Sequence, residues 1–311
     1  MATRTRSEHP PVRRGDRIFS ATALGAGILI LLILAGVAIF LLVQGVPGIT
    51  AGRGSLSGRD SFWAYVGPFA FGTVFASIIA LVVAVPIAVG IALFISHYAP
   101  RRVALALGYI VDLLAAVPSV VFGVWGITVL SPALVPIMQW LEDNAGFLPF
   151  FEGPTLTSGR NMFTAGLVLA VMILPIITAI CREVFLQTPR LHEEAALALG
   201  ATRWEMIRMT VFPYGRSGIV SASMLGLGRA LGETLAVALV LSGSAIYTFN
   251  TLAAENSGTI AANIALQFPE ASGTAVNVLI ATGLILFVIT FAVNYTARKI
   301  VDRRSEFSGA N

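Results

Sequence analysis

The sequence predicts an all-α protein that crosses a membrane several times. Of its 311 residues, 56% are hydrophobic and only 12% are charged, and the mean hydropathy is +0.84. A soluble domain carries about 25% charged residues, so this composition indicates a polytopic membrane protein. Long apolar runs and an uneven distribution of basic residues between the loops favour the same class.

Six apolar runs divide the chain, and each is long enough to cross the ~30 Å apolar core of a bilayer as a helix. They cover residues 21–43, 67–95, 103–130, 162–181, 218–243 and 275–297. The first run is too long for a cleaved signal peptide and is expected to remain as a span. Pro86, Pro118 and Pro175 predict kinks in the second, third and fourth spans.

The basic residues predict that both ends of the chain lie in the cytoplasm. With that topology, sixteen of the 20 Lys and Arg residues fall on inner segments, three on outer loops and one within a span. Cytoplasmic loops carry the excess of positive charge in membrane proteins, and the reversed topology would invert the ratio. We therefore expect a cytoplasmic segment at 1–20, a six-helix membrane domain at 21–304 with a cytoplasmic loop at 182–216, and a cytoplasmic tail at 305–311.

The large cytoplasmic loop begins with the signals of a short helix. Thr188 can cap that helix, and Pro189 then stands at its first position, where a missing N–H costs nothing. Ala195 and Ala196 leave little side-chain bulk, so that another helix or a protein groove can approach the backbone. Gly200 can end the helix in a left-handed conformation.

A second short helix is expected directly after the first. Thr202 and Glu205 have the Thr-x-x-Glu spacing of a capping box, and the helix is expected to run to about Thr210 before Pro213 stops it. A plain connector between two spans needs only a few residues, whereas this one has about 30. The loop is therefore interpreted as a docking surface.

The same loop resembles the EAA signature of ATP-binding-cassette (ABC) import permeases, commonly written E-A-A-x3-G-x9-I-x-L-P. The residues in register with it are Glu194, Ala195, Ala196, Gly200 and Pro213. Thr210 and Phe212 depart from it, because the signature has Ile and Leu there. In that family the stretch is the coupling helix, which sits in a cleft of a separate ATPase subunit. The resemblance implies this role here, including Glu193, with Glu194 as the partner of a basic group on the ATPase.

Several other kinds of chemistry are not expected. The single cysteine, Cys181, excludes an internal disulfide framework, and the three histidines are scattered without a metal-binding spacing. The only lysine, Lys299, has no P-loop around it, so the chain is not expected to hydrolyse ATP by itself. The loop at 244–274 contains a helix-like piece at 259–268, and its sequence indicates no chemistry.

Three ionisable residues fall inside the predicted spans: Asp112, Arg229 and Glu233. A buried charge is costly in a bilayer and is expected to face a partner or a watery path. Glu233 follows Arg229 by four residues, which places both on one helix face, and Asp112 is expected at a similar depth. The group is either a structural ion cluster or a site on a path for an anion that can still donate a hydrogen bond.

Two further stretches resemble one particular group of ABC import permeases. Residues 228–234 look like the RALGET sequence of phosphate-specific ABC permeases, and residues 112–126 resemble the third-span signature of their C-type subunit. Asp112 stands where that family often has Glu, which keeps the charge but shortens its reach. The resemblance implies a type I importer permease fold and inorganic phosphate as substrate. It also implies five residues on the substrate path: Asp112, Ser119, Arg229, Glu233 and Thr234.

The resemblance also implies partners and location. These are a homologous A-type permease subunit, an ATP-binding-cassette ATPase dimer and an extracytoplasmic phosphate-binding protein, in the inner (plasma) membrane of a prokaryote. ATP and Mg²⁺ are then bound by the ATPase, so we expect no cofactor, no covalent chemistry and no nucleic-acid partner for this chain.

Two other functions stay open at this point. An ABC permease for sulfate, molybdate or an amino acid would share the EAA stretch but not RALGET. A stand-alone secondary transporter or channel would use the group of Asp112, Arg229 and Glu233, and would leave the coupling stretch unexplained.

Overall fold

The computed structural model describes residues 14–52, 54, 56 and 58–305, and that part of the chain is mostly helical, as predicted. The helices are α1 (Arg14–Ile49), α2 (Phe62–Leu93), α3 (Arg101–Ala115), α4 (Ser119–Trp125), α5 (Ser131–Ala145), α6 (Met162–Leu186), α7 (Arg190–Ala198), α8 (Arg203–Met206), α9 (Phe212–Leu231), α10 (Leu235–Val240), α11 (Ile260–Gln267) and α12 (Thr274–Ser305). Between them lie the π-helical turns η2 (Phe94–Tyr98), η3 (Gly126–Leu130) and η4 (Ile207–Val211), and the 3₁₀ turn η5 (Phe268–Glu270). Strands β1 (Gly243–Ser244) and β2 (Asn256–Ser257) pair in parallel.

Five helical stretches of the described chain are long and apolar enough to cross a membrane. They are Gly15–Ile49, Phe62–Tyr98, Ser119–Ala145, Met162–Leu186 and Thr274–Lys299. The predicted run at 218–243 is absent from this set; its helix ends at Leu231, and a new one, α10, starts at Leu235 after three intervening residues. The count of six spans and the orientation in the membrane therefore stay predictions.

Two of the predicted spans are wrong as continuous helices. The run at 103–130 is broken at residues 116–118, because Pro118 disfavours a helical conformation at the residue before it. The run at 218–243 is broken at residues 232–234. By contrast, Pro86 and Pro175 lie inside the uninterrupted helices α2 and α6.

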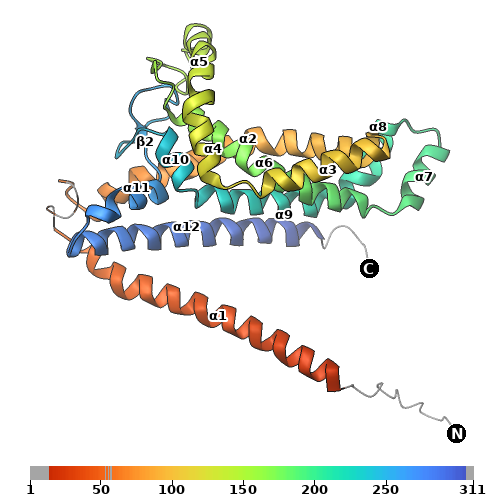
Figure 1. Ribbon diagram of the computed structural model, residues 1–311, viewed down its shortest axis with the longest axis horizontal. Helices are drawn as coiled ribbons and strands as arrows, with labels where there is room; N and C mark the ends of the chain where they lie inside the picture. Colours follow the sequence, from red (N-terminus) through yellow and green to blue (C-terminus); the bar gives the residue numbers. More distant parts are fainter. Residues whose placement is uncertain (1–13, 53, 55, 57, 306–311) are drawn as a thin grey trace.

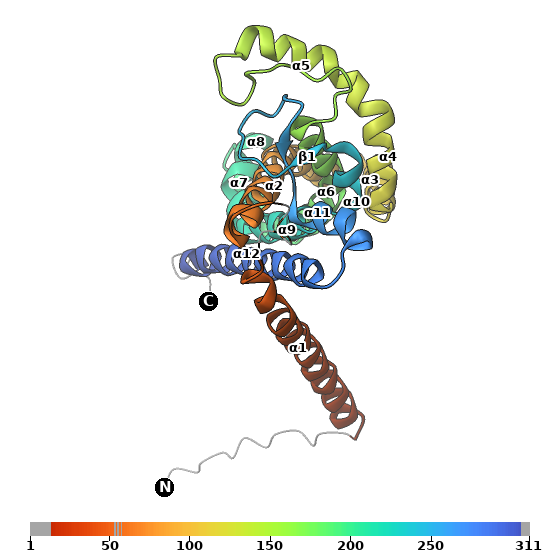
Figure 2. The same ribbon diagram turned by 90° about the vertical axis from the view of Figure 1, so that its left-hand side faces the viewer.

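The centre of the molecule is the packing of α2 against α6, with α9 alongside (Figure 2). Along α2 runs a ladder of buried alanines at every fourth position: Ala76, Ala80, Ala84, Ala88 and Ala92. Residues four apart share one helix face, and small side chains let a neighbouring helix approach closely. Met172, Ile173 and Ile177 of α6 belong to the same buried cluster.

Helices α1 and α12 lie on one side of this centre. α1 contacts α12 near its own C-terminal end and diverges from the bundle toward its N-terminal end (Figure 1). Gly48 permits that contact, since a Cβ there would come within 2.7 Å of the backbone nitrogen of Val278. None of the most apolar part of α1 is buried, so its surface is available to lipid.

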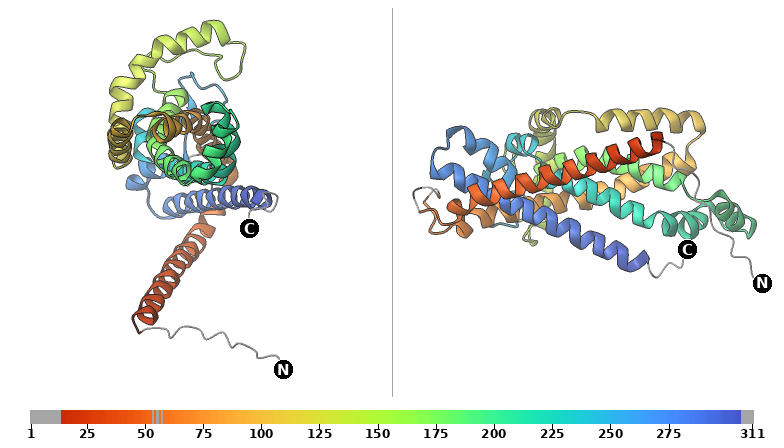
Figure 3. Two further views of the ribbon diagram at one scale, coloured as in Figure 1. Left: turned by 90° about the vertical axis from the view of Figure 1, so that its right-hand side faces the viewer. Right: turned by 90° about the horizontal axis from the view of Figure 1, so that it is seen from below.

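The long helices separate two ends of the molecule. Helices α7 and α8 form one end, and α10, α11 and the two strands lie toward the other (Figure 1). The N-terminal end of α1 and the C-terminal end of α12 point toward the same end as α7 and α8 (Figure 3). This arrangement agrees with the topology predicted from the basic residues, in which these parts share one side of the membrane.

Candidate functional site

The predicted start of the first coupling helix is wrong in detail. Helix α7 begins at Arg190, and Pro189 occupies its N-cap position without a side-chain capping hydrogen bond. The Oγ1 atom of Thr188 is buried and has no hydrogen-bond partner among the described residues. The proline itself sets the extended backbone that precedes the helix, so Thr188 is not needed as a cap.

The predicted end of that helix is confirmed. Gly200 has a φ of +85°, a conformation that L side chains rarely adopt. Its N–H donates to the carbonyl of Leu197 at 3.0 Å, which closes the last turn. The preceding Leu199 is 90% exposed.

The capping box of the second helix is also confirmed. The N–H of Thr202 donates to Glu205 Oε2 at 2.8 Å, and the N–H of Glu205 donates to Thr202 Oγ1 at 3.3 Å. The hydroxyl of Thr202 also donates to Glu205 Oε2, and the two hydrogen bonds from the Thr202 backbone and hydroxyl hold the pKa of Glu205 below its ordinary value. The two residues therefore fix the start of α8 at Arg203.

Pro213 does not stop the second helix, contrary to the prediction. The chain passes from α8 through the π-helical turn η4 into α9, and Pro213 stands in the first turn of α9. In η4 the N–H of Phe212 donates to Ile207, five residues back. This wider turn shifts the hydrogen-bond register just before the proline, so the helix continues although Pro213 has no donor.

The coupling segment, residues 188–213, carries apolar side chains on its surface. Leu191, Leu199, Trp204 and Met209 are all more than half exposed, although the segment lies outside the long apolar helices. Glu194 and Ala195 are also exposed, whereas Ala196 is buried. Apolar side chains exposed together on a charged segment mark a surface for a protein partner.

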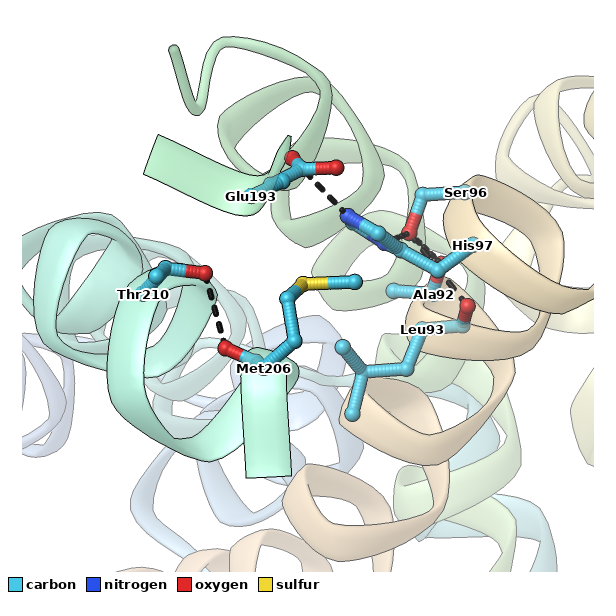
Figure 4. A network of polar contacts seen from close by, with 7 residues as sticks. All are labelled: Ala92, Leu93, Ser96, His97, Glu193, Met206 and Thr210. Carbon is cyan, nitrogen blue, oxygen red and sulfur yellow. Dashed lines mark hydrogen bonds and ion pairs between the residues drawn. The ribbon is translucent and has the colours of Figure 1, made fainter. Parts of the chain in front are cut away.

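Glu193 ties this segment to the end of α2 (Figure 4). Its Oε1 lies 3.4 Å from Nε2 of His97, which belongs to η2 and is only 9% exposed. Nδ1 of the same ring lies 2.7 Å from Oγ of Ser96, which donates to the carbonyl of Ala92. Of the predicted coupling residues, Glu193 is therefore the one with a polar contact to the helical core.

The predicted group of Asp112, Arg229 and Glu233 does not form. Asp112 instead pairs with Arg182 of α6, whose Nη2 lies 3.8 Å from Oδ2. Arg229 is exposed in the last turn of α9 and makes no hydrogen bond or ion pair with a described residue. α9 ends between Arg229 and Glu233, so the inference that they share a helix face is also wrong.

Glu233 and Thr234 occupy the break between α9 and α10. Glu233 is buried, and its Oε1 accepts a hydrogen bond from the N–H of Ala236 at 3.1 Å, which caps the first turn of α10. The hydroxyl of Thr234 donates to the carbonyl of Gly232. The carboxylate of Glu233 is therefore bound by a backbone donor, and no ion pair joins it to Arg229 in the part of the chain that the structure describes.

The second halves of the two interrupted runs, α4 and α10, contact each other. Ser119 is the first residue of α4, directly after the break at Pro118. Thr234 stands directly before α10, after the second break. A Cβ at Gly123 of α4 would lie 2.8 Å from Cα of Ala236, so the backbones of α4 and α10 are in close contact. Ser119, Glu233 and Thr234 thus lie at the interruptions of the third and fifth runs, and Asp112 and Arg229 lie in the helices just before them. The second halves of those runs pack together.

A pocket at the other end of the molecule was not predicted. Its volume is about 280 Å³, and its polar lining comes from Arg59, Tyr65, Thr259, Asn263 and Gln267. Arg59 is one of the three basic residues assigned to outer loops, and α11 matches the helix-like piece noted at 259–268. Arg59 and this helix-like piece are the only features of the sequence that point to the pocket, because the pocket joins segments about 200 residues apart.

Comparisons with known proteins identify relatives of the whole chain. Residues 84–304 match the family described as binding-protein-dependent transport system inner membrane component. The chain is 50% identical to the phosphate transport system permease protein PstC 2 of Mycobacterium bovis, over 93% of each chain. It is 46% identical to the phosphate transport system permease protein PstC of Mycobacterium leprae, over 94% of this chain and 95% of that one.

Solved structures share the fold. A chain of a bacterial ABC transporter that imports the acidic polysaccharide alginate superposes with a TM-score of 0.59 at 18% identity, covering 93% of this chain and 96% of that one. A chain of the MetNI methionine ABC transporter in an inward-facing conformation gives a TM-score of 0.50 at 18% identity, covering 85% and 96%. At such low identity these likenesses concern the fold alone.

Proposed function

The chain belongs to the inner membrane components of binding-protein-dependent transport systems, and from this premise we propose that it is the permease subunit of an ATP-driven importer of inorganic phosphate. It is a multi-pass membrane protein and a transport component rather than an enzyme. Phosphate as the substrate is supported by the two mycobacterial relatives, which are named for phosphate transport and are about half identical over nearly the whole length.

The observation that carries the proposal is the coupling segment. A folded pair of helices exposes Leu191, Leu199 and Trp204 away from the long apolar helices and is anchored to α2 through Glu193 and His97. This is the arrangement required to receive a soluble ATPase and to pass its closure to the bundle. Glu194, exposed on α7, is proposed to pair with a basic group of that ATPase, which binds ATP and Mg²⁺.

Arg229 is proposed to serve the substrate. Its guanidinium is exposed and has no partner among the described residues, unlike Arg182, which pairs with two acids. The planar guanidinium can hold two oxygens of a phosphate at once. Asp112, Ser119, Glu233 and Thr234 are proposed to lie along the same path, at or near the helix breaks.

The other partners complete the proposal. A homologous A-type permease subunit forms the second half of the path, and an extracytoplasmic phosphate-binding protein delivers the substrate. Closure of the ATPase, received at the coupling segment, then reorients the helices around the path, which gives alternating access.

The test is phosphate uptake by cells carrying Arg229 variants, measured together with the amount of assembled complex. Arg229→Gln is expected to assemble and to transport little phosphate, and Arg229→Lys to recover only part of the uptake. The double variant Arg229→Gln with Glu233→Gln is the matched control for a structural charge pair. Recovery of uptake in that double variant would show that Arg229 balances an acid and would refute its role toward the anion.

A further inference from the structure

The pocket at the end opposite the coupling segment has features of an anion site. It is formed by the loop before α2, the beginning of α2, the end of α10, the residues after α10, and α11. Arg59 is the only charged residue among the described residues that line it. A cavity with one arginine and no carboxylate favours an anion.

One wall of the pocket is a fixed chain of hydrogen bonds. Asn263 donates from Nδ2 to the hydroxyl of Tyr65 at 3.0 Å, and that hydroxyl donates to Oε1 of Gln267 at 3.0 Å. Gln267 in turn donates from Nε2 to Oδ1 of Asn263 at 2.6 Å. Each amide uses one of its two N–H bonds in this ring of contacts, so each keeps a second N–H for a ligand.

Arg59 is held in place without losing its capacity to bind. Its Nη2 donates to the carbonyl of Ala245 at 2.6 Å, which joins the loop before α2 to the segment after β1. A guanidinium has five N–H donors in a rigid fork. The anchor therefore orients the group and leaves most of its donors for an oxyanion.

The pocket is connected to the predicted substrate path by one short helix. Ala238 and Leu241, at the end of α10, line the pocket, while Glu233 and Thr234 stand at the other end of α10. Six helical residues span about 9 Å. In the predicted topology the pocket faces the outside, because α10 and α11, which help to line it, lie toward the end away from α7 and α8 (Figure 1).

We propose that this pocket is an entry site for free inorganic phosphate, where Arg59 and the amides of Asn263 and Gln267 bind the anion before it reaches Arg229. The inference rests on the proposed function and adds a second binding site to it. The same chemistry would suit the phosphate of a lipid headgroup, and the experiment separates the two sources.

The test uses a cysteine placed at the pocket of the assembled, purified complex. Leu266 lines the pocket and is 63% exposed, and the chain has one native cysteine, so Leu266→Cys in a Cys181→Ala background gives a single reporter. The rate of its reaction with a hydrophilic thiol reagent is measured with inorganic phosphate and with chloride at the same ionic strength. Glu255→Cys, exposed and outside the lining, is the control position.

Phosphate is expected to slow the reaction at position 266 and not at 255. Adding Arg59→Gln is expected to raise the phosphate concentration for half-protection by about tenfold or more, the usual effect of losing a hydrogen bond to a charged group. Arg59→Lys should recover part of the protection. Arg160→Gln, which removes an equal charge from a residue outside the pocket, should leave it unchanged.

Three results would overturn the entry site. They are equal rates with phosphate and chloride, protection that survives Arg59→Gln, and protection by anionic phospholipid but not by inorganic phosphate. Uptake by the Leu266→Cys complex is measured in parallel. If uptake persists without protection, the entry site is wrong and the importer stands, whereas absence of phosphate uptake in the unmodified complex would refute the proposed function itself.

Discussion

The two ends of this permease are built in opposite ways. At the coupling end, the deciding hydrogen bonds join residues three apart, as in the capping box of Thr202 and Glu205. At the pocket end they join residues far apart in the chain: Tyr65 to Gln267, 202 positions away, and Thr73 to Ile260, 187 positions away. The helix cap of the first end is local, although Met206, Ile207 and Val211 pack into the main core, whereas these hydrogen bonds of the second end exist only when the bundle is assembled.

This difference suits two different tasks. A segment whose helix cap is local and whose Met206, Ile207 and Val211 pack into the core can keep its shape against a soluble partner and pass the partner's motion to the bundle. A pocket held by contacts between distant segments keeps its donors at fixed positions, which suits recognition of a small anion. Damage to the packing of the pocket end is therefore expected to affect assembly, whereas damage to the coupling end is expected to affect the use of ATP.

The largest effect is expected from Gly72→Leu in α2. A Cβ at this position would collide with the carbonyl of Gly258 and lie 2.7 Å from the carbonyl oxygen of Ser257, both backbone atoms that cannot move aside. Overpacking of this kind costs roughly 1–3 kcal/mol or more, so the complex should not assemble. Gly90→Leu in the same helix, where nothing lies within 4 Å, is the control and should assemble normally. Assembly is measured by copurification, and normal assembly of Gly72→Leu would contradict the rigid pocket end.

A smaller effect is expected from breaking the polar contact between the coupling segment and α2. His97→Ala and Glu193→Gln should leave assembly intact and lower uptake several-fold, since a contact of roughly 1 kcal/mol is lost. The ATP hydrolysed per phosphate transported should rise in both variants. His192→Ala, an exposed histidine on α7, is the matched control. An unchanged ATP-to-phosphate ratio in both variants would exclude this contact from coupling.

Local unfolding of the coupling segment tests the capping box. Thr202→Ala should destabilise α8 locally by roughly 0.5–2 kcal/mol, the usual cost of losing a cap, and speed hydrogen exchange of the amides of residues 203–206.

The pKa of Glu205 is lowered in the folded state. The cap therefore contributes stability above the unfolded-state pKa and loses it as pH falls through the folded-state pKa. Glu205→Gln should abolish this acid sensitivity, and identical pH profiles for both proteins would count against the cap.

The smallest effect on stability is expected from Asp112→Asn. Its pair with Arg182 is 3.8 Å long and the aspartate side chain is 52% exposed, so the pair should contribute less than about 1 kcal/mol. The thermal midpoint of the complex that carries Asp112→Asn should change by only a few degrees. The complex that carries Arg182→Gln should show a change of similar size. Because Asp112 is proposed to lie along the path, uptake by Asp112→Asn should fall at an almost unchanged thermal midpoint, and undiminished uptake would remove Asp112 from the path.

Features that depend on a few neighbouring residues were predictable from the sequence. The left-handed Gly200 and the Thr202–Glu205 box follow from local backbone chemistry, and both were predicted at the right residues. Thr188 and Pro213 were misjudged, because a proline N-cap and a π-helical turn offer alternatives that propensities do not distinguish.

Features that depend on tertiary contacts were not predictable. The break at residues 232–234 was missed because an apolar run gives no sign that Glu233 will cap a new helix. Asp112 was grouped with Arg229, whereas it pairs with Arg182, since equal depth along two helices does not fix which faces meet. The pocket joins α2 to α11 across most of the chain, and no local pattern reports such a contact.

The central claim is that transport through this chain is driven by an ATPase docked on the coupling segment. Its most direct test is phosphate uptake into proteoliposomes that hold the purified complex, with and without the ATPase subunit and with ATP supplied on the side of that subunit. Phosphate uptake is expected only when both the ATPase and ATP are present. Gly200→Leu should reduce uptake to the level seen without the ATPase. Uptake at an unchanged rate in vesicles lacking the ATPase would contradict the account and show a channel or secondary transporter instead.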